Sequence, residues 1–120
     1  MQNLYIVIEV IKVKYYHVTL FNNVESILKE GLIPQIGQRS IDANETEKLV
    51  YLFQDLIDVE NALMNWLGDW YTDVYGEDIP LAILEIILPI DFPIEEGIVE
   101  YEKISKQKIP PKFIRFLRKE

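Results

Sequence analysis

Three side chains of chemically useful type lie in or beside apolar segments of this sequence: His17, Tyr51 and Glu102. His17 is the only histidine, and it ends a β-branched and aromatic segment just before Thr19 and the start of a predicted helix. Ligand contacts are common where strands run into loops, so His17 is a candidate binding residue. The alternative is a histidine at the surface, or one whose hydrogen bonds are satisfied inside the protein, since this residue type is often only partly buried.

Glu102 and Glu100 lie in residues 98–104, an alternating segment that predicts a half-buried strand. The alternation places Ile98 and Ile104 on the same face as the two glutamates. Because a carboxylate is costly to bury unless it is paired or faces a cleft, this strand is a candidate wall of a site. An edge strand with a solvated face is equally compatible with the alternation.

Tyr51 and Arg39 are further candidates. Tyr51 lies in residues 48–53, a short apolar segment that predicts a strand. It either faces a site or packs in the core with its hydroxyl at the rim. Arg39 follows Gly37 in a predicted loop over residues 33–47, and its fork of donors suits a phosphate group, which makes it a candidate cofactor-binding residue.

The composition excludes several kinds of site. With 120 residues, 49% of them hydrophobic and 27% charged, the chain predicts one folded domain over residues 1–120 rather than a disordered segment. It has no cysteine, which excludes disulfides, thiolate metal ligands and cysteine nucleophiles. With one histidine and no cluster of metal ligands, we expect no metal site. No glycine-rich phosphate loop and no nucleophile-elbow motif is present.

The charge is unevenly distributed. Residues 1–102 hold 5 basic and 19 acidic side chains, a net charge of −14, whereas residues 103–120 hold 7 basic and 1 acidic, a net charge of +6. An acidic body repels phosphate backbones, which argues against a nucleic-acid partner. The basic end is either an anion contact or a solvated terminal face. The first residues lack a basic leader pattern and the apolar runs are too short to span a bilayer, so we expect a cytoplasmic protein without a membrane partner.

Strands and helices are expected in the order β, α, β, α, β, β, which predicts an α+β domain. The predicted elements are a strand-forming segment over 4–16, a helix from Asn22 or Asn23 to Glu30 closed by Gly31, a strand over 48–53, a helix from Asp55 or Asp58 to about Trp70, a central strand over 81–88, a strand over 98–104, and a short helix or turn over 112–117 after two prolines. The second helix places Trp66 and Trp70 on an apolar face that we expect to pack in the core.

Three segments together resemble the ADP-ribosyltransferase fold in its His-Tyr-Glu form. Residues 16–34 resemble the opening of that superfamily, in which His-x-Thr precedes a helix ending in Ile-Leu-x-x-Gly-Leu-x-Pro. Residues 50–53 resemble the strand that carries the tyrosine. Residues 101–114 resemble the strand of the catalytic glutamate, followed by Ile-Pro-Pro-x-x-Ile, an ending similar to that of DNA-targeting DarT-type and tRNA 2′-phosphotransferase-like members.

The resemblance implies an ADP-ribosyltransferase-like fold, with a small split β-sheet core and two main helices, and NAD as a substrate. It implies that His17 hydrogen-bonds the adenosine ribose, that Thr19 supports the same end of NAD, and that Tyr51 stacks on the nicotinamide. Glu102 would hold the nicotinamide ribose 2′-hydroxyl and stabilise the oxocarbenium-like charge that develops as nicotinamide leaves. Glu100 would activate the acceptor.

We therefore expect an NAD-dependent mono-ADP-ribosyltransferase, or an NAD glycohydrolase of the same fold, that acts on a protein or small-molecule acceptor. The 2′-phosphotransferase branch is disfavoured because Arg39 is the only basic residue in a suitable loop before residue 103. The alternative is a non-catalytic module on the same fold that binds a partner or a nucleotide. The catalytic interpretation requires His17, Tyr51 and Glu102 to line one cleft, with Glu102 partly accessible.

Overall fold

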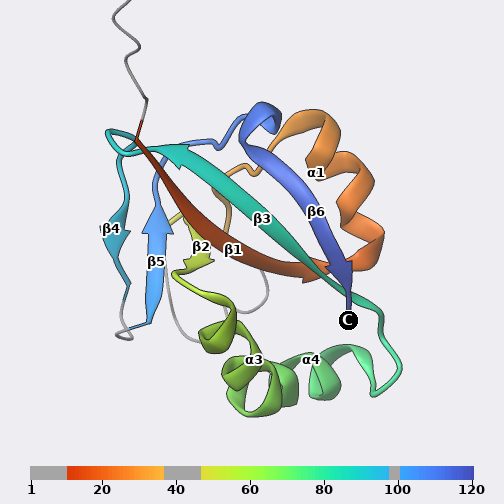
Figure 1. Cartoon of the computed structure of the whole chain (residues 1–120). Helices are drawn as coiled ribbons and strands as arrows, with labels where there is room; N and C mark the ends of the chain where they lie inside the picture. The colour runs from red at the N-terminus through yellow and green to blue at the C-terminus, as the bar shows by residue number, and fades with distance from the viewer. Residues whose placement is uncertain (1–10, 37–46, 98–100) are drawn as a thin grey trace, which may run out of the picture.

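The computed structural model describes residues 11–36, 47–97 and 101–120. Its strands form one antiparallel sheet in the order β4-β5-β2-β1-β3-β6 (Figure 1). The strands are β1 (Lys12–Leu20), β2 (Val50–Phe53), β3 (Leu81–Pro89), β4 (Glu95–Glu96), β5 (Glu102–Ser105) and β6 (Ile114–Lys119). The described helices are α1 (Val24–Glu30), α3 (Leu56–Met64) and α4 (Trp66–Tyr75), with the 3₁₀ turns η1 (Phe21–Asn23) and η2 (Pro111–Phe113). The predicted α+β class is confirmed.

The sheet consists of two three-stranded halves that meet at a narrow joint. In one half, β1 pairs with β3 over its whole length, from Lys12 opposite Pro89 to Leu20 opposite Leu81. In the other half, all of β2 pairs with β5. Between β1 and β2 the register holds a single pair, Tyr16 opposite Phe53. The two strands therefore diverge on one side of this pair, after Tyr16 in β1 and before Phe53 in β2.

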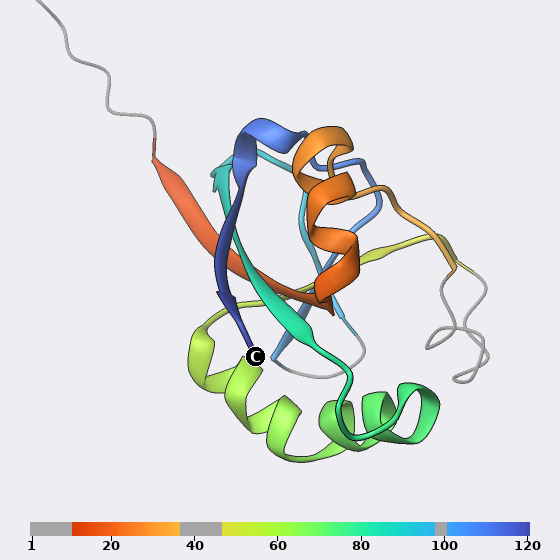
Figure 2. The same cartoon turned by 90° about the vertical axis from the view of Figure 1, so that its right-hand side faces the viewer.

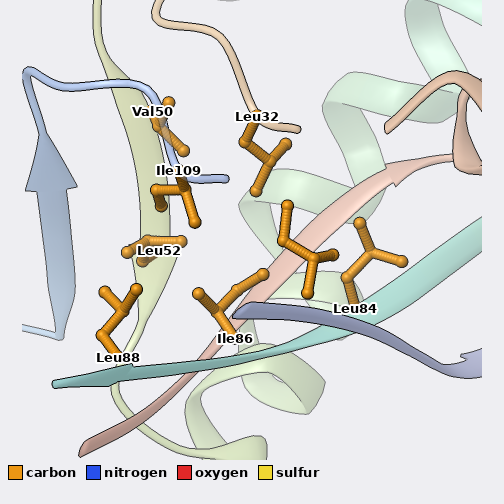
Figure 3. Close-up of a cluster of buried hydrophobic side chains, with 8 residues drawn as sticks. Leu32, Val50, Leu52, Leu84, Ile86, Leu88 and Ile109 are labelled. Atoms are coloured by element: carbon orange, nitrogen blue, oxygen red, sulfur yellow. The ribbon is translucent and has the colours of Figure 1, made fainter. Parts of the chain in front are cut away.

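Different helices cover the two faces of the sheet, as the two views of the molecule show (Figures 1 and 2). On the face of α1, the core cluster consists of Leu32, Val50, Leu52, Leu84, Ile86, Leu88, Ile109 and Ile114 (Figure 3). On the face of α3 and α4, it consists of Val18, Phe53, Val59, Ala62, Leu67 and Ile83. Adjacent residues of one strand enter different clusters because strand side chains alternate between faces.

Glycines shape the ends of the helices. Gly31 ends α1 as predicted, with φ of 94°, and its N–H donates to the Ile27 carbonyl over 2.7 Å. The predicted second helix is instead two helices, because the chain turns sharply at Asn65 and α4 packs back against α3. Gly68 permits this approach, since a Cβ there would lie 1.8 Å from the Leu63 carbonyl oxygen. The helical segment also runs past the predicted end, to Tyr75.

The structure corrects two further element predictions. Strand β1 extends to Leu20, so His17 lies inside a strand rather than at its end. The predicted helix or turn over 112–117 is a 3₁₀ turn at Pro111–Phe113 followed by strand β6, which pairs with β3. Strand β6 pairs with a strand some 30 residues earlier, with Arg115 opposite Glu85. Local sequence patterns do not predict such a non-local interaction. None of the helices in the described ranges is long and apolar enough to cross a membrane.

Candidate functional site

A groove lies where β1 and β2 part. It has one half toward α1, with a volume of about 400 Å³, and another toward α4, with a volume of about 190 Å³. The residues common to both halves are His17, Thr19, Asn23, Gln35 and Tyr51. Because these residues line both cavities, the two cavities adjoin each other and are called the two halves of one groove.

The segment after α1 is held alongside this groove by backbone pairing. Leu32 and Ile109 exchange two hydrogen bonds of 3.0 and 2.9 Å. Gln35 and Leu49 exchange two longer ones of 3.5 and 3.4 Å, just before β2 begins. These bridges place the Gln35 side chain in the groove wall, between the end of α1 and the start of β2.

The two halves of the groove differ in chemistry. The half toward α1 adds hydroxyl and carboxylate groups from Ser26 and Glu30. The half toward α4 is aromatic and, within its described lining, contains no aspartate, glutamate, lysine or arginine. Its aromatic residues are Tyr51, Phe53, Trp70, Tyr71 and Tyr75. Trp70 meets Tyr71 and Tyr75 edge-on, with ring centroids 5.0 and 5.9 Å apart, which gives this half a rigid aromatic wall.

His17 and Tyr51, 34 residues apart in sequence, meet across the divergence of the strands. His17 Nδ1 lies 2.7 Å from the Tyr51 carbonyl oxygen. Because a carbonyl can only accept, Nδ1 carries the hydrogen and donates it. In the neutral form of the ring, Nε2 is then the acceptor nitrogen. This bond continues the connection between β1 and β2 beyond their last backbone pair and fixes the plane of the imidazole.

Thr19 and Tyr51 line the same groove as His17. Thr19 lies two residues after His17 on the same face of β1, and its hydroxyl is 3.5 Å from Asn23 Nδ2. The Tyr51 side chain is half-buried and lines both halves of the groove, so it is not sealed in the core. The structure thus brings together three of the residues that the sequence singled out.

Glu102 lies one strand away from the groove, so the structure does not show the single cleft lined by His17, Tyr51 and Glu102 that the catalytic interpretation requires. It is 5% exposed, sits opposite Phe53 in the β2–β5 ladder, and does not line either half. Tyr51, two residues before Phe53, shares the face of Glu102 and is its diagonal neighbour, a relation that corresponds to about 7–8 Å in antiparallel sheets. Gly97 lies beside Glu102 in the sheet, because the Gly97 N–H donates to the Glu102 carbonyl over 2.8 Å and continues the pairing of β4 with β5. A Cβ at Gly97 would lie 2.7 Å from that oxygen.

The second buried carboxylate belongs to Glu85, 4% exposed, in a strand that the sequence shows as nearly all apolar. Arg115 Nη2 donates to it over 2.7 Å from the neighbouring strand, and Lys14 Nζ lies 3.8 Å away. These two cations account for the burial of Glu85 without any ligand. Glu85 is thus a structural ion-pair residue outside the groove.

Several residues have a different location in the structure from the one that the sequence predicts, or were not identified as site residues. Trp70 lines the groove and Trp66 is 36% exposed, so neither is simply a core residue. The groove residues that sequence analysis did not identify as site candidates include Asn23, Gln35, Trp70, Tyr71 and Tyr75. Glu100 and Arg39, predicted to activate the acceptor and to hold a phosphate, lie outside the described residues.

Within residues 11–36, 47–97 and 101–120, no group of three or more histidine, cysteine, aspartate or glutamate side chains is arranged to hold a metal ion. No protein-family model, no curated protein and no solved structure matches this chain. The function is therefore argued from the groove itself and from the sequence resemblance.

Proposed function

We propose that the groove between β1 and β2 binds NAD and that the protein is a mono-ADP-ribosyltransferase, or an NAD glycohydrolase. The observation that carries this proposal is the convergence of His17, Thr19 and Tyr51 on one groove, at the joint between the two halves of the sheet. These are the residues to which the resemblance gives NAD-binding roles. The larger half of the groove falls within the 300–1,000 Å³ typical of small-molecule sites.

The chemistry of the two halves supports one orientation of the dinucleotide. The aromatic, uncharged half suits the nicotinamide ring, which stacks on Tyr51 beside the wall of Trp70. The polar half toward α1 suits the adenosine end. There, His17 Nε2 accepts a hydrogen bond from a ribose hydroxyl while Nδ1 remains fixed by the Tyr51 carbonyl.

Glu102 supplies the charge for catalysis in this proposal. As the C1′–N bond breaks, nicotinamide leaves with the bonding electrons and positive charge develops on the ribose. A carboxylate near C1′ stabilises that charge, more strongly in a poorly hydrated setting than in water. The acceptor, or water, then bonds to C1′ and loses a proton. For this step, the buried Glu102 side chain must turn past Phe53 toward its diagonal neighbour Tyr51.

The diphosphate of NAD needs hydrogen-bond donors. Among the described groove residues, neutral donors are available from Asn23, Ser26 and Gln35, and no lysine or arginine lines either half. Arg39, which the sequence places in the segment between Gln35 and β2, is the residue that we expect to supply a cation.

A second candidate function is a non-catalytic module that binds a nucleotide in the same groove. It is favoured by one observation, the 5% exposure of Glu102 outside the groove lining. Both functions use His17 and Tyr51 for binding. They differ in whether Glu102 takes part.

Nicotinamide release from NAD, followed by proton NMR, tests the enzymatic proposal. The wild-type protein should release nicotinamide, and Glu102→Gln should reduce the rate by about two orders of magnitude or more while NAD still binds. Glu96→Gln, an exposed carboxamide change on β4, is the matched control and should retain the wild-type rate. Equal rates for the wild-type protein and Glu102→Gln would exclude the catalytic role. Binding without release in every variant would support the nucleotide-binding module.

A further inference from the structure

A separate pocket of about 230 Å³ lies between α3, the start of α4 and the residue before β5. Its lining residues are Asp58, Asn61, Ala62, Asn65, Trp66 and Tyr101. None of them lines either half of the groove. Phe53 lies between the two sites, because it lines the groove while its ring centroid is 6.5 Å from that of Trp66 and 6.3 Å from that of Tyr101.

The pocket combines two aromatic rings with oxygen acceptors. Tyr101 is stacked on Phe53 with an interplanar angle of 8°, and Trp66 is tilted by 36° from the same ring, so both rings have orientations set by Phe53. The Asn65 side-chain nitrogen donates to the Asn61 carbonyl over 2.8 Å, which leaves the Asn65 side-chain oxygen as its acceptor. Asp58 adds a carboxylate. A ligand that meets these groups must therefore donate hydrogen bonds and stack on aromatic faces.

The electrostatic environment of Asp58 favours a cation. Partial burial, followed by the negative charge of Asp55 and a hydrogen bond to it, raises the pKa of Asp58. A helix N-terminus acts in the opposite direction on a carboxylate in its first turn, where Asp58 lies. Within the described part of the chain, no lysine, arginine or histidine forms a salt bridge with Asp58. A positive ligand would relieve the repulsion between the two aspartates.

We propose that this pocket binds a guanidinium group, presented by an arginine side chain of a partner protein. A guanidinium is planar, stacks on Trp and Tyr faces, and carries a fork of donors that matches a carboxylate and neighbouring amide oxygens. A lysine ammonium has the charge but neither the plane nor the fork. The net charge of −14 over residues 1–102, which include every residue that lines the pocket, favours a basic partner surface. This inference does not rest on the proposed use of NAD.

The two tryptophans allow the pocket and the groove to be observed separately. Trp66 lines the pocket, Trp70 lines the groove, and the chain has no other tryptophan. In ¹⁵N-labelled protein, each indole N–H gives one NMR signal. Titration with Nα-acetyl-arginine methylamide should move the Trp66 signal saturably and leave the Trp70 signal in place. Titration with NAD should move the Trp70 signal, so failure of one proposal is distinguishable from failure of the other.

Variants and related probes define the chemistry. Asp58→Asn should lower the affinity for Nα-acetyl-arginine methylamide about tenfold or more, because a charged hydrogen-bond partner is lost. Asp69→Asn, which removes an exposed charge from α4, should leave this affinity unchanged. Nα-acetyl-lysine methylamide should bind at least severalfold more weakly than the arginine compound. Agmatine tests whether the natural ligand is a small free guanidine. A shift of the Trp66 signal with agmatine but not with the blocked arginine would overturn the assignment to a protein side chain. A Trp66 signal that moves with neither probe, or that moves equally in Asp58→Asn, would overturn the site.

Discussion

The hydrogen bond between His17 Nδ1 and the Tyr51 carbonyl gives the two ring nitrogens separate roles, which substitutions can separate. In His17→Asn, the side-chain amide nitrogen takes nearly the place of Nδ1 and can keep the 2.7 Å bond, but nothing replaces Nε2. In His17→Leu, both nitrogens are lost at similar side-chain size. We expect His17→Asn to keep stability and lose NAD affinity, and His17→Leu to lose both.

The magnitudes follow from the partial burial of His17. A hydrogen bond of this kind contributes about 0.5–1.5 kcal/mol. His17→Leu should therefore lower the free energy of unfolding by about 1 kcal/mol, or Tm by roughly 3–6 °C for a chain of this length. Loss of the Nε2 contact with the ribose should weaken NAD binding by about fivefold in both variants.

Chemical denaturation and calorimetric NAD titration of the two variants supply the comparison. If His17→Asn were as destabilised as His17→Leu, the Nδ1 bond would not hold the strands together as described. If His17→Asn bound NAD as tightly as the wild-type protein, Nε2 would have no part in binding.

Three further predictions concern the scaffold around the site. Gly68→Ala should lower the free energy of unfolding by about 2–3 kcal/mol, because its Cβ would meet the Leu63 carbonyl at 1.8 Å; unchanged urea unfolding would contradict the close packing of α3 and α4. Arg115→Ala should cost about 1–2 kcal/mol because it removes the nearest cation from the buried Glu85 carboxylate, and adding Glu85→Leu to this variant should recover most of the loss. Asp58→Asn should change the pH dependence of stability. Because the folded pKa of Asp58 is raised, the stabilising contribution of this group is complete below its ordinary value of 3.8 and is lost as pH rises through the folded value. Unfolding measured across that range should show wild-type stability falling relative to Asp58→Asn, and parallel curves would contradict the raised pKa.

Local sequence signals were sufficient for the elements that local interactions determine. The helix closed by Gly31 and the apolar strand β3 were predicted nearly to their ends, because a C-terminal glycine and a continuous apolar run are readable from neighbouring residues. The break between α3 and α4 at Asn65 was not predicted, because it depends on the approach of Gly68 to Leu63, a contact between the two helices. Strand β6 was missed for the same reason, since its partner is β3.

The residues of the candidate site also fall into those that the sequence identifies and those that depend on tertiary contacts. His17 and Tyr51 were identified from the sequence by residue type, position and the resemblance, and the structure places the His17 ring against the Tyr51 carbonyl. The aromatic wall around Trp70 was missed because α4 reaches the groove only after the turn at Asn65. For Glu102, the alternation of β5 indicated its face but not its near-complete burial or the close approach of the Gly97 backbone beside it.

Intermolecular NOEs between bound NAD and the side chains of the groove test the central claim most directly. The account predicts NOEs from the nicotinamide protons to the rings of Tyr51 and Trp70, and from the adenosine ribose to the His17 imidazole. Bound NAD with NOEs confined to side chains outside the groove, or no NAD binding at all, would contradict it.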